Sequence, residues 1–339
     1  MCMSKKHVKS PCCQGKIYQH GQRRRQCSIC KRTWRIRQKT KGRKSKRYNP
    51  NLVKRYLSNV SFNLNEHAQK LSITVPALRK RIRKNLNLFL ETEQWLKPPN
   101  DKDLIAVVDA LIEKIFRGKK KKYYTVYFII LRATDSDEAV ILKPVIYPRY
   151  ENKADWQRAL KKIPKSTRSR ILALIGDGEP SYITITKDNH WLLQRCHFHL
   201  LAELHRYASR KRKSKNRKLV EKIDKLVRSI ITTKDEKELS KNLIQILKLI
   251  NNPDVPARIK TRFLKGFYRN HQLYRTYLYH PELNIPTTSN SCEALCRITR
   301  KFLSKTHGLN SVKFFLKWTQ ALMLCRKKII CKGTSFPPN

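Results

Sequence analysis

The order of the apolar segments between residues 103 and 177 constrains the fold most strongly. Four short runs rich in β-branched and aromatic residues follow one another, with a helical segment before the last. The runs are DLIAVVDALI, YYTVYFIILRA, AVILKPVIY and RILALIGD, and the helix is ADWQRALKKI. Three adjacent strands, a helix and a further strand indicate an α/β core built on a sheet.

Three carboxylates stand at the edges of apolar segments: Asp109, Asp177 and Glu293. A charge inside a run such as LIAVVDALI is costly to bury unless it is paired or binds a cation. The strand order is that expected of a ribonuclease-H-like sheet, in which Asp109 and Asp177 lie side by side and a later helix delivers Glu293. Each acid also has an ordinary interpretation. Asp177 could be a turn residue, and Asn290 with Glu293 has the spacing of a capping box.

Carboxylate oxygens are the ligands that Mg²⁺ or Mn²⁺ prefers. Two such cations about 3.5 to 4 Å apart activate an attacking hydroxyl and stabilise the leaving oxygen of a phosphodiester. We therefore expect Asp109, Asp177 and Glu293 to be metal ligands of a catalytic site.

The charge of the chain predicts a polyanionic partner. It has 76 Lys and Arg against 24 Asp and Glu, a formal net charge of +52, and this excess predicts strong, salt-dependent binding to DNA or RNA. An anionic membrane surface could also attract it. However, no apolar stretch approaches the roughly 20 residues of a spanning helix, and no signal peptide opens the sequence. We expect an intracellular protein.

Five of the ten cysteines lie between Cys2 and Cys30. In a reducing compartment such a cluster favours zinc over disulfides. Cys27 and Cys30 form a C-x-x-C half-site, but Ser10 stands where the usual second half has a cysteine. Cys13 then needs a fourth ligand, which could be Cys12, His7 or Cys2; alternatively the site could be empty.

Helical spacing of apolar residues between 51 and 90 predicts helices interrupted near Ser72. Thr74 is a suitable N-cap, and Pro76 falls in the first turn, where its missing N–H costs little. The pattern predicts a helix-turn-helix whose second helix enters a DNA major groove. The alternative is a solvated basic helix that packs only on its neighbours. The candidate contacts on this helix are Arg79, Lys80, Arg81, Arg83 and Lys84.

Further basic residues are candidate DNA contacts in three segments, although a solvated helix face is the alternative for the last of them. They are Arg23, Arg24, Arg25, Arg35 and Arg37 near the cysteines, Arg210 and Arg212 in HRYASRKRKSKNRKL, and Arg297 and Arg300 after Glu293. The C-terminal KFFLKWTQALMLC is an amphipathic helix expected to pack on the sheet.

Five segments follow one another in an order that resembles one family: QRRRQCSICKRTWRIR, VVDA, LIGDGEPSY, QRCHFHL and PTTSNSCEALCRITR. The chain resembles DDE transposases of the Mutator-like superfamily, on the prokaryotic insertion-sequence branch with an N-terminal zinc ribbon and helix-turn-helix. The resemblance implies a ribonuclease-H-like fold with an all-helical insertion between the second and third acids. The sequence has room for it between His205 and Ile285.

The C-x-x-H of Cys196 and His199 is a feature of this superfamily. A thiolate and an imidazole three residues apart can share a metal, but two ligands are too few for a zinc site. We expect a supporting role for the pair near the acids. The alternative is that Cys196 is simply buried at a strand end.

The expected organisation has seven parts. They are a zinc ribbon (1–38), a basic linker (39–49), a helix-turn-helix domain (50–92), a linker (93–102), the first part of the ribonuclease-H-like core (103–204), a helical insertion (205–285) and the C-terminal helices of the core (286–339).

The resemblance implies a transposase that binds the ends of its mobile element and catalyses metal-dependent DNA cleavage and strand transfer, with Mg²⁺ or Mn²⁺ at the acids and Zn²⁺ in the ribbon. The alternatives are a ribonuclease-H-like nuclease without joining activity, or a non-catalytic domesticated regulator. We expect double-stranded DNA as the partner, a homodimer or higher oligomer on it, and a cytoplasmic, nucleoid-associated location in a prokaryote.

Overall fold

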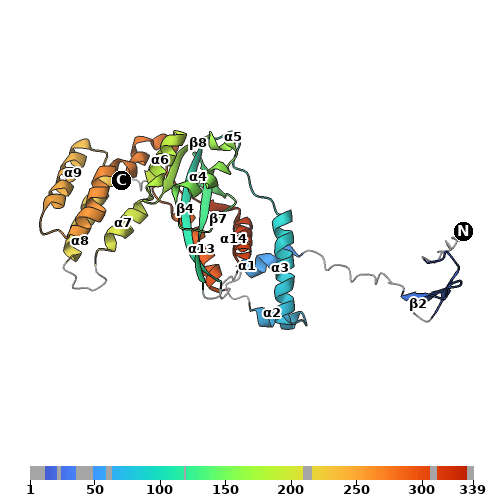
Figure 1. Cartoon of the computed structure of the whole chain (residues 1–339). Coiled ribbons are helices and arrows are strands. Elements are labelled where there is room, and N and C mark those ends of the chain that lie inside the picture. The colour runs from blue at the N-terminus through green and yellow to red at the C-terminus, as the bar shows by residue number, and fades with distance from the viewer. Residues whose placement is uncertain are drawn as a thin grey trace. The chain divides into compact units, whose positions relative to one another are not determined.

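The computed structural model describes residues 12–20, 24–35, 49–58, 63–117, 120–208, 216–305 and 311–333. Contacts divide the chain into two compact units, Met1–Asn49 and Pro50–Asn339 (Figure 1). Each unit has a sheet of its own.

The first unit contains a three-stranded antiparallel sheet. Its strands are β1 (Ile17–Gln19), β2 (Arg24–Cys27) and β3 (Thr33–Arg35), with β2 in the centre. Two residues in this unit have positive φ angles, Gln14 at 53° and Lys31 at 56°. Each follows a pair of cysteines, so both pairs precede a tight turn of the backbone.

The second unit is built on a mixed sheet. Its strand order is β10-β6-β5-β4-β8-β9, and β7 also pairs with β5. β4, β8 and β9 run parallel, whereas the other pairs are antiparallel. The strands are β4 (Leu104–Arg117), β5 (Lys120–Ala133), β6 (Glu138–Ile141), β7 (Val145–Tyr147), β8 (Ile171–Gly176), β9 (Leu192–Arg195) and β10 (Lys328–Ile330). The unit is therefore mixed α/β, as expected.

Two details differ from the sequence interpretation. The third expected run is interrupted between β6 and β7, where Pro144 has no N–H to give to the ladder. The part expected to hold only C-terminal helices also contributes β10, which pairs with β6 at the edge of the sheet. A three-residue edge strand has too little pattern to be found in the sequence.

Helices cover both faces of this sheet. On one face, α4 (Lys153–Lys161) and α6 (Ser181–Asn189) bury Trp156 and Tyr182 against the sheet. On the other, α13 (Asn290–Lys305) contacts β4 and β5, and α14 (Val312–Arg326) contacts β6. The expected C-terminal helix on the sheet is thus α14.

Three helices precede the sheet: α1 (Pro50–Ser58), α2 (Leu64–Lys70) and α3 (Val75–Thr92). Thr74 is the N-cap of α3, with its side chain accepting a hydrogen bond from the Ala77 amide at 3.3 Å, and Pro76 lies in the first turn. Both predictions for the start of this helix are confirmed.

Helices α1 and α3 pack on α14 within the second unit. The rings of Tyr56 and Trp318 are 5.0 Å apart, and the Arg83 guanidinium lies 5.0 Å from the centre of the Phe314 ring. Helices α1 and α3 therefore share a core with the rest of the second unit, and α2 packs on α3.

The described residues between His205 and Ile285 contain helices and no strand. After α7 (His197–His205), helices α8 and α9 lie side by side (Figure 1). Their apolar faces share a core with α7 and the short helices that follow. The helical elements after α7 are α8 (Arg217–Thr232), α9 (Glu236–Asn251), α10 (Ala257–Ile259), η1 (Lys260–Leu264), α11 (Lys265–Asn270), η2 (His271–Tyr274), α12 (Thr276–Tyr279) and η3 (Pro281–Leu283). Helix α5 (Lys165–Arg168) lies earlier in the chain, before β8.

Candidate functional site

Asp109 and Asp177 occupy matching positions on neighbouring parallel strands. The last paired residues of β4 and β8 are Val107 and Ile175, and each acid lies two residues further along its strand direction. Asp109 continues within β4, whereas Asp177 begins the loop after β8. The two carboxylates therefore stand at the same edge of the parallel ladder.

Asp109 is held from two directions. Its Oδ1 accepts a hydrogen bond from the Ala110 amide at 2.8 Å, and its Oδ2 accepts one from the Cys296 thiol of α13 at 3.4 Å. Its side chain is only 8% exposed. Burial raises the pKa of Asp109 to about 6, and the Asp177 charge adds to this effect, whereas His199 and the two hydrogen bonds oppose it.

Asp177 forms the turn that was its alternative interpretation. Its Oδ1 accepts a hydrogen bond from the Glu179 amide at 3.0 Å, which fixes the loop after β8. Among the described residues, no hydrogen bond or ion pair reaches its second carboxylate oxygen. A structural role for one oxygen thus leaves the other free for a ligand.

Glu293 lies in the first turn of α13 and is partly exposed. Two cysteines on either side of it hold this turn on β4. Cys292 donates to the Val107 carbonyl at 3.1 Å, and Cys296 donates to Asp109. The helix that carries the third acid is therefore fixed on the strand that carries the first.

Cys196 and His199 connect the loops around the three acids. The Cys196 amide donates to the Gly176 carbonyl at 2.7 Å, next to Asp177, and its sulfur accepts from the Ser289 amide at 3.3 Å. The Ser289 hydroxyl lies 3.5 Å from His199 Nδ1, and the Ser289 carbonyl accepts the amide hydrogen of Glu293. The pair thus links the loop of the second acid to the helix of the third.

The two side chains also perturb each other. The hydrogen bond to Cys196 raises the pKa of His199 to about 9 against the effect of burial, and Asp109 and Asp177 contribute further. Burial alone would raise the pKa of Cys196, but hydrogen bonds to His199 and Ser289 outweigh it and lower that pKa. A positive imidazolium is therefore favoured close to the acids.

Sequence reasoning missed two further acids that act on this site. Glu179 lies two residues after Asp177, and its Oε1 accepts from the Ser181 amide at 3.2 Å. Glu151 lies between β7 and α4; burial raises its pKa to about 7, and the charges of Asp177, Glu179 and Asp109 raise it further. Glu179 was visible in the motif GDGEP, but only the folded chain brings Glu151 to the same edge.

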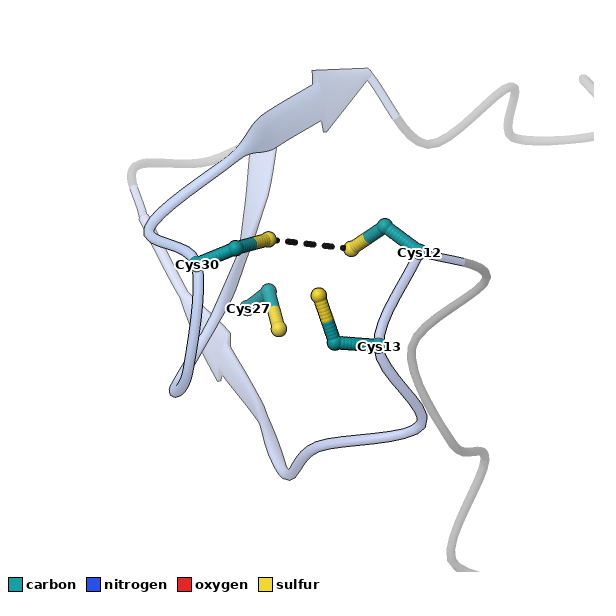
Figure 2. Close-up of side chains that lie close together, drawn as sticks. All are labelled: Cys12, Cys13, Cys27 and Cys30. Carbon is teal, nitrogen blue, oxygen red and sulfur yellow. Dashed lines mark hydrogen bonds between the residues drawn. The ribbon is translucent and has the colours of Figure 1, made fainter.

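Four cysteines form a second candidate site, in the first unit. The sulfurs of Cys12, Cys13, Cys27 and Cys30 all lie within 4.8 Å of one another (Figure 2). Cys12 and Cys30 are 3.3 Å apart between sulfurs. Neighbouring thiols raise the pKa of Cys13 to about 12, with Cys30 the largest influence. Of the candidate fourth ligands, Cys12 is thus the one in the cluster, and His7 and Cys2 lie outside the described residues.

Within the described part of the chain, these cysteines are the only group of three or more metal-ligating residues with ligand atoms that close together. Asp109, Asp177 and Glu293 do not form such a group. The cysteine cluster is therefore compact, whereas the three acids are further apart than this limit.

The candidate DNA contacts are mostly exposed. On α3, Arg81 is partly buried; after Glu293, Arg300 pairs with Glu113 at 3.3 Å. Arg23, Arg37, Arg210 and Arg212 lie outside the described residues, and the side chain of Arg35 is not described. The exposed candidates are Arg24, Arg79, Lys80, Arg83, Lys84, Arg297 and Arg300, and Arg25 is partly buried.

No model of a known protein family matches the chain, and no curated protein matches it. Among the helices of the described residues, none combines the length and the apolar character needed to cross a membrane.

Proposed function

We propose that the chain is a DDE-type DNA transposase that binds the ends of its mobile element and catalyses DNA cleavage and strand transfer. The observation that carries the proposal is the matching position of Asp109 and Asp177 on β4 and β8, with the helix of Glu293 fixed on β4. The three acids come from distant parts of the sequence; Asp109 and Asp177 lie at one edge of the parallel strands, and α13, which carries Glu293, is hydrogen-bonded to β4.

The sheet supports a ribonuclease-H-like core. Counted along the chain, β4 is the first strand, β5 the second, β6 with β7 the third, β8 the fourth and β9 the fifth. Across the sheet, these strands lie in the order third, second, first, fourth, fifth. The first three are antiparallel, and the fourth and fifth run parallel to the first. The helical residues between His205 and Ile285 fit the insertion that the resemblance implies.

The acidic site has the donors that Mg²⁺ or Mn²⁺ would need. Asp109, Asp177 and Glu293 offer carboxylate oxygens, the hard ligands these cations prefer. The hydroxyl of Tyr182 is buried and has no hydrogen-bond partner in the part of the chain that the structure describes, and the charges of Asp177 and Asp109 act on it. The chemistry that two divalent cations supply at such a site is activation of the attacking hydroxyl and stabilisation of the leaving oxygen.

The chain's own residues would hold and orient this site. Cys296 fixes one oxygen of Asp109, and Cys196 with His199 joins the loop of Asp177 to the helix of Glu293. This arrangement supports the predicted supporting role of the Cys196 and His199 pair. Substitution of either residue would loosen the acids relative to one another.

The four cysteines have the spacing of a zinc site. Four sulfurs bound to one tetrahedral Zn²⁺ at about 2.3 Å would be ~3.8 Å from one another. The observed cluster, with all sulfurs within 4.8 Å, is compatible with this geometry. We propose that Cys12, Cys13, Cys27 and Cys30 bind Zn²⁺ in a ribbon that contributes to DNA binding.

Helices α2 and α3 support a helix-turn-helix proposal. A short turn joins them, with Ser72 at a positive φ of 50°. Arg83 stacks on Phe314, so Arg79, Lys80 and Lys84 are the better candidates for contact with DNA phosphates. The net charge of +52 supports binding that weakens as salt rises.

The test is a cleavage and joining assay. The purified chain is incubated with Mg²⁺ or Mn²⁺ and labelled DNA carrying the terminal inverted repeats that flank its gene. We expect Asp177→Asn to lower cleavage and joining by about 100-fold or more, because metal-assisted chemistry contributes several kcal/mol and each ~1.4 kcal/mol is tenfold in rate.

Asp188→Asn is the matched control, because Asp188 is an exposed acid on α6. It should retain wild-type activity. Cutting without joining would instead support a nuclease. Salt-sensitive DNA binding without any metal-dependent reaction would support a non-catalytic regulator.

A further inference from the structure

Glu151 is a fourth acid held at the edge of the sheet where Asp109 and Asp177 lie. It stands just before α4, whose N-cap is Asn152. The indole N–H of Trp156, a completely buried side chain, donates to Glu151 Oε1 at 2.6 Å. The carboxylate therefore has a fixed orientation set by the core of the protein.

Only one oxygen of Glu151 is engaged. Within the described residues, Oε2 has no hydrogen-bond or ion-pair partner. Burial raises the pKa of Glu151 to about 7, the Trp156 hydrogen bond opposes this, and Asp177, Glu179 and Asp109 each raise it further. The Trp156 ring that holds Glu151 lies edge-on to the Tyr182 ring, with 5.4 Å between the ring centres, and the Tyr182 ring packs on Gly176, the residue before Asp177. The same pair of aromatic rings therefore links Glu151 to the loop of Asp177.

Asp109, Glu151, Asp177 and Glu179 have no Lys or Arg partner. Among the described residues, none of the four pairs with a Lys or Arg, although the chain has 76 such residues, and the His199 imidazolium acts on Asp109 and Asp177. Asp155, four residues after Glu151, differs: it is buried and held by Arg149 at 2.8 Å and Arg158 at 3.1 Å. Several carboxylates beside one imidazolium are costly to gather unless a further cation joins them.

A second observation points to a ligand at the same place. The Tyr182 side chain is 1% exposed, and its hydroxyl has no hydrogen-bond partner among the described residues. Burial raises the pKa of this hydroxyl, and the charges of Asp177, Glu151, Asp109 and Glu179 raise it further. Its ring packs on Gly176, where a Cβ atom would overlap it. A buried hydroxyl without a partner indicates a bound group that completes the site.

We infer that Glu151 is a fourth carboxylate ligand of the divalent-cation site formed with Asp109 and Asp177. The inference rests on the proposed function, because it adds a residue to the same site. Glu151 offers its free oxygen to the cation, and Trp156 keeps that oxygen aimed by holding the other. The cation supplies positive charge in addition to that of the His199 imidazolium.

The test measures Mn²⁺ binding to the full chain by calorimetry, with zinc already bound and no DNA present. We expect Glu151→Gln to weaken Mn²⁺ binding by about 10-fold or more, since affinity for hard cations follows the charge count of the ligands. Glu138→Gln is the matched control. Glu138 is an exposed acid on β6 that pairs with Lys328, so its loss should leave Mn²⁺ binding unchanged.

The outcomes separate the two proposals. If the wild type and Asp177→Asn both fail to bind Mn²⁺, the proposed function is overturned together with this inference. If the wild type binds, Asp177→Asn does not, and Glu151→Gln binds as tightly as the wild type, only the role of Glu151 is overturned.

A second measurement uses the wild type, so its result does not depend on whether a variant folds. Tb³⁺ is a hard cation whose luminescence is excited through an aromatic ring close to it. Because Trp156 touches Glu151, we expect Tb³⁺ bound to the wild type to emit on indole excitation and Mn²⁺ to displace it. Absence of this emission when Tb³⁺ is bound would overturn the inference.

Discussion

At the scale of single residues, the acidic site depends on neutral partners. Cys296 and Ala110 fix Asp109, Trp156 fixes Glu151, and the Glu179 amide fixes Asp177. Each partner holds one carboxylate oxygen without neutralising the charge. The acids are therefore oriented by partners that bring no positive charge, which suits residues that bind a cation.

His197 gives the second unit a pH-dependent stability. Burial lowers its pKa to about 4, and its Nε2 lies 2.6 Å from the Tyr274 carbonyl, to which the neutral ring donates. In the unfolded chain, His197 binds a proton with a pKa near 6.5, whereas in the folded chain it binds the proton only at a lower pH. The stability that the neutral ring contributes is therefore present above pH 6.5 and is lost as pH falls through about 4.

We expect this loss to reach at most about 3 kcal/mol, from a shift of ~2.5 pKa units. The measurement is urea unfolding between pH 7.5 and 4, compared with His197→Gln, which keeps a donor but cannot titrate. The wild type should lose more stability than the variant. An imidazole NMR titration of His197 with a midpoint near 6.5 would contradict this prediction.

At the scale of elements, α14 joins the sheet to helices α1 and α3. Trp318 is 5% exposed and contacts Tyr56 of α1 and Phe302 of α13, with ring centres 5.0 Å and 5.6 Å apart. We expect Trp318→Ala to lower the free energy of unfolding by about 3 to 5 kcal/mol, because it leaves a cavity at this junction.

Hydrogen exchange of the α1 and α3 amides checks the same prediction. These amides should lose protection in Trp318→Ala together with those of α14. Lys313→Ala, at an exposed position of the same helix, should change stability by no more than about 0.5 kcal/mol. If α1 and α3 keep their protection in Trp318→Ala, they fold independently of α14.

Several elements could be predicted from the sequence because their patterns are local. The strands around Asp109 and Asp177 have continuous apolar runs, and the start of α3 has its own cap at Thr74. The packing of α3 on α14 could not be predicted in this way, because it depends on contacts such as Asn87 with Lys317, far apart in the chain. Glu151 was missed for the same reason, since no local pattern links it to the acids.

At the scale of the whole molecule, the two units should respond differently to metal removal. Among its described residues, the first unit buries little apolar surface, and its four cysteines form a cluster that could hold it together by binding a metal. The second has extensive apolar cores of its own. We expect one Zn²⁺ per chain, and we expect a chelator to unfold residues 12–35 without changing the melting temperature of the second unit.

Zinc content by atomic absorption and melting by calorimetry check this expectation. Cys12→Ser should weaken zinc binding, whereas Cys325→Ser, a change in α14 of the second unit, should not. Equal zinc affinity and stoichiometry in Cys12→Ser would show that Cys12 is not a ligand.

The docking of α13 on β4 also determines when the acidic site can exist during synthesis. Cys296 and Asp109 are 187 residues apart in sequence, yet they touch in the folded chain. A ribosome that has completed β4, β8 and the intervening segments has not yet made Glu293. The incomplete chain therefore lacks the third acid and the thiol that holds the first, and the site can form only after most of the protein has been synthesised.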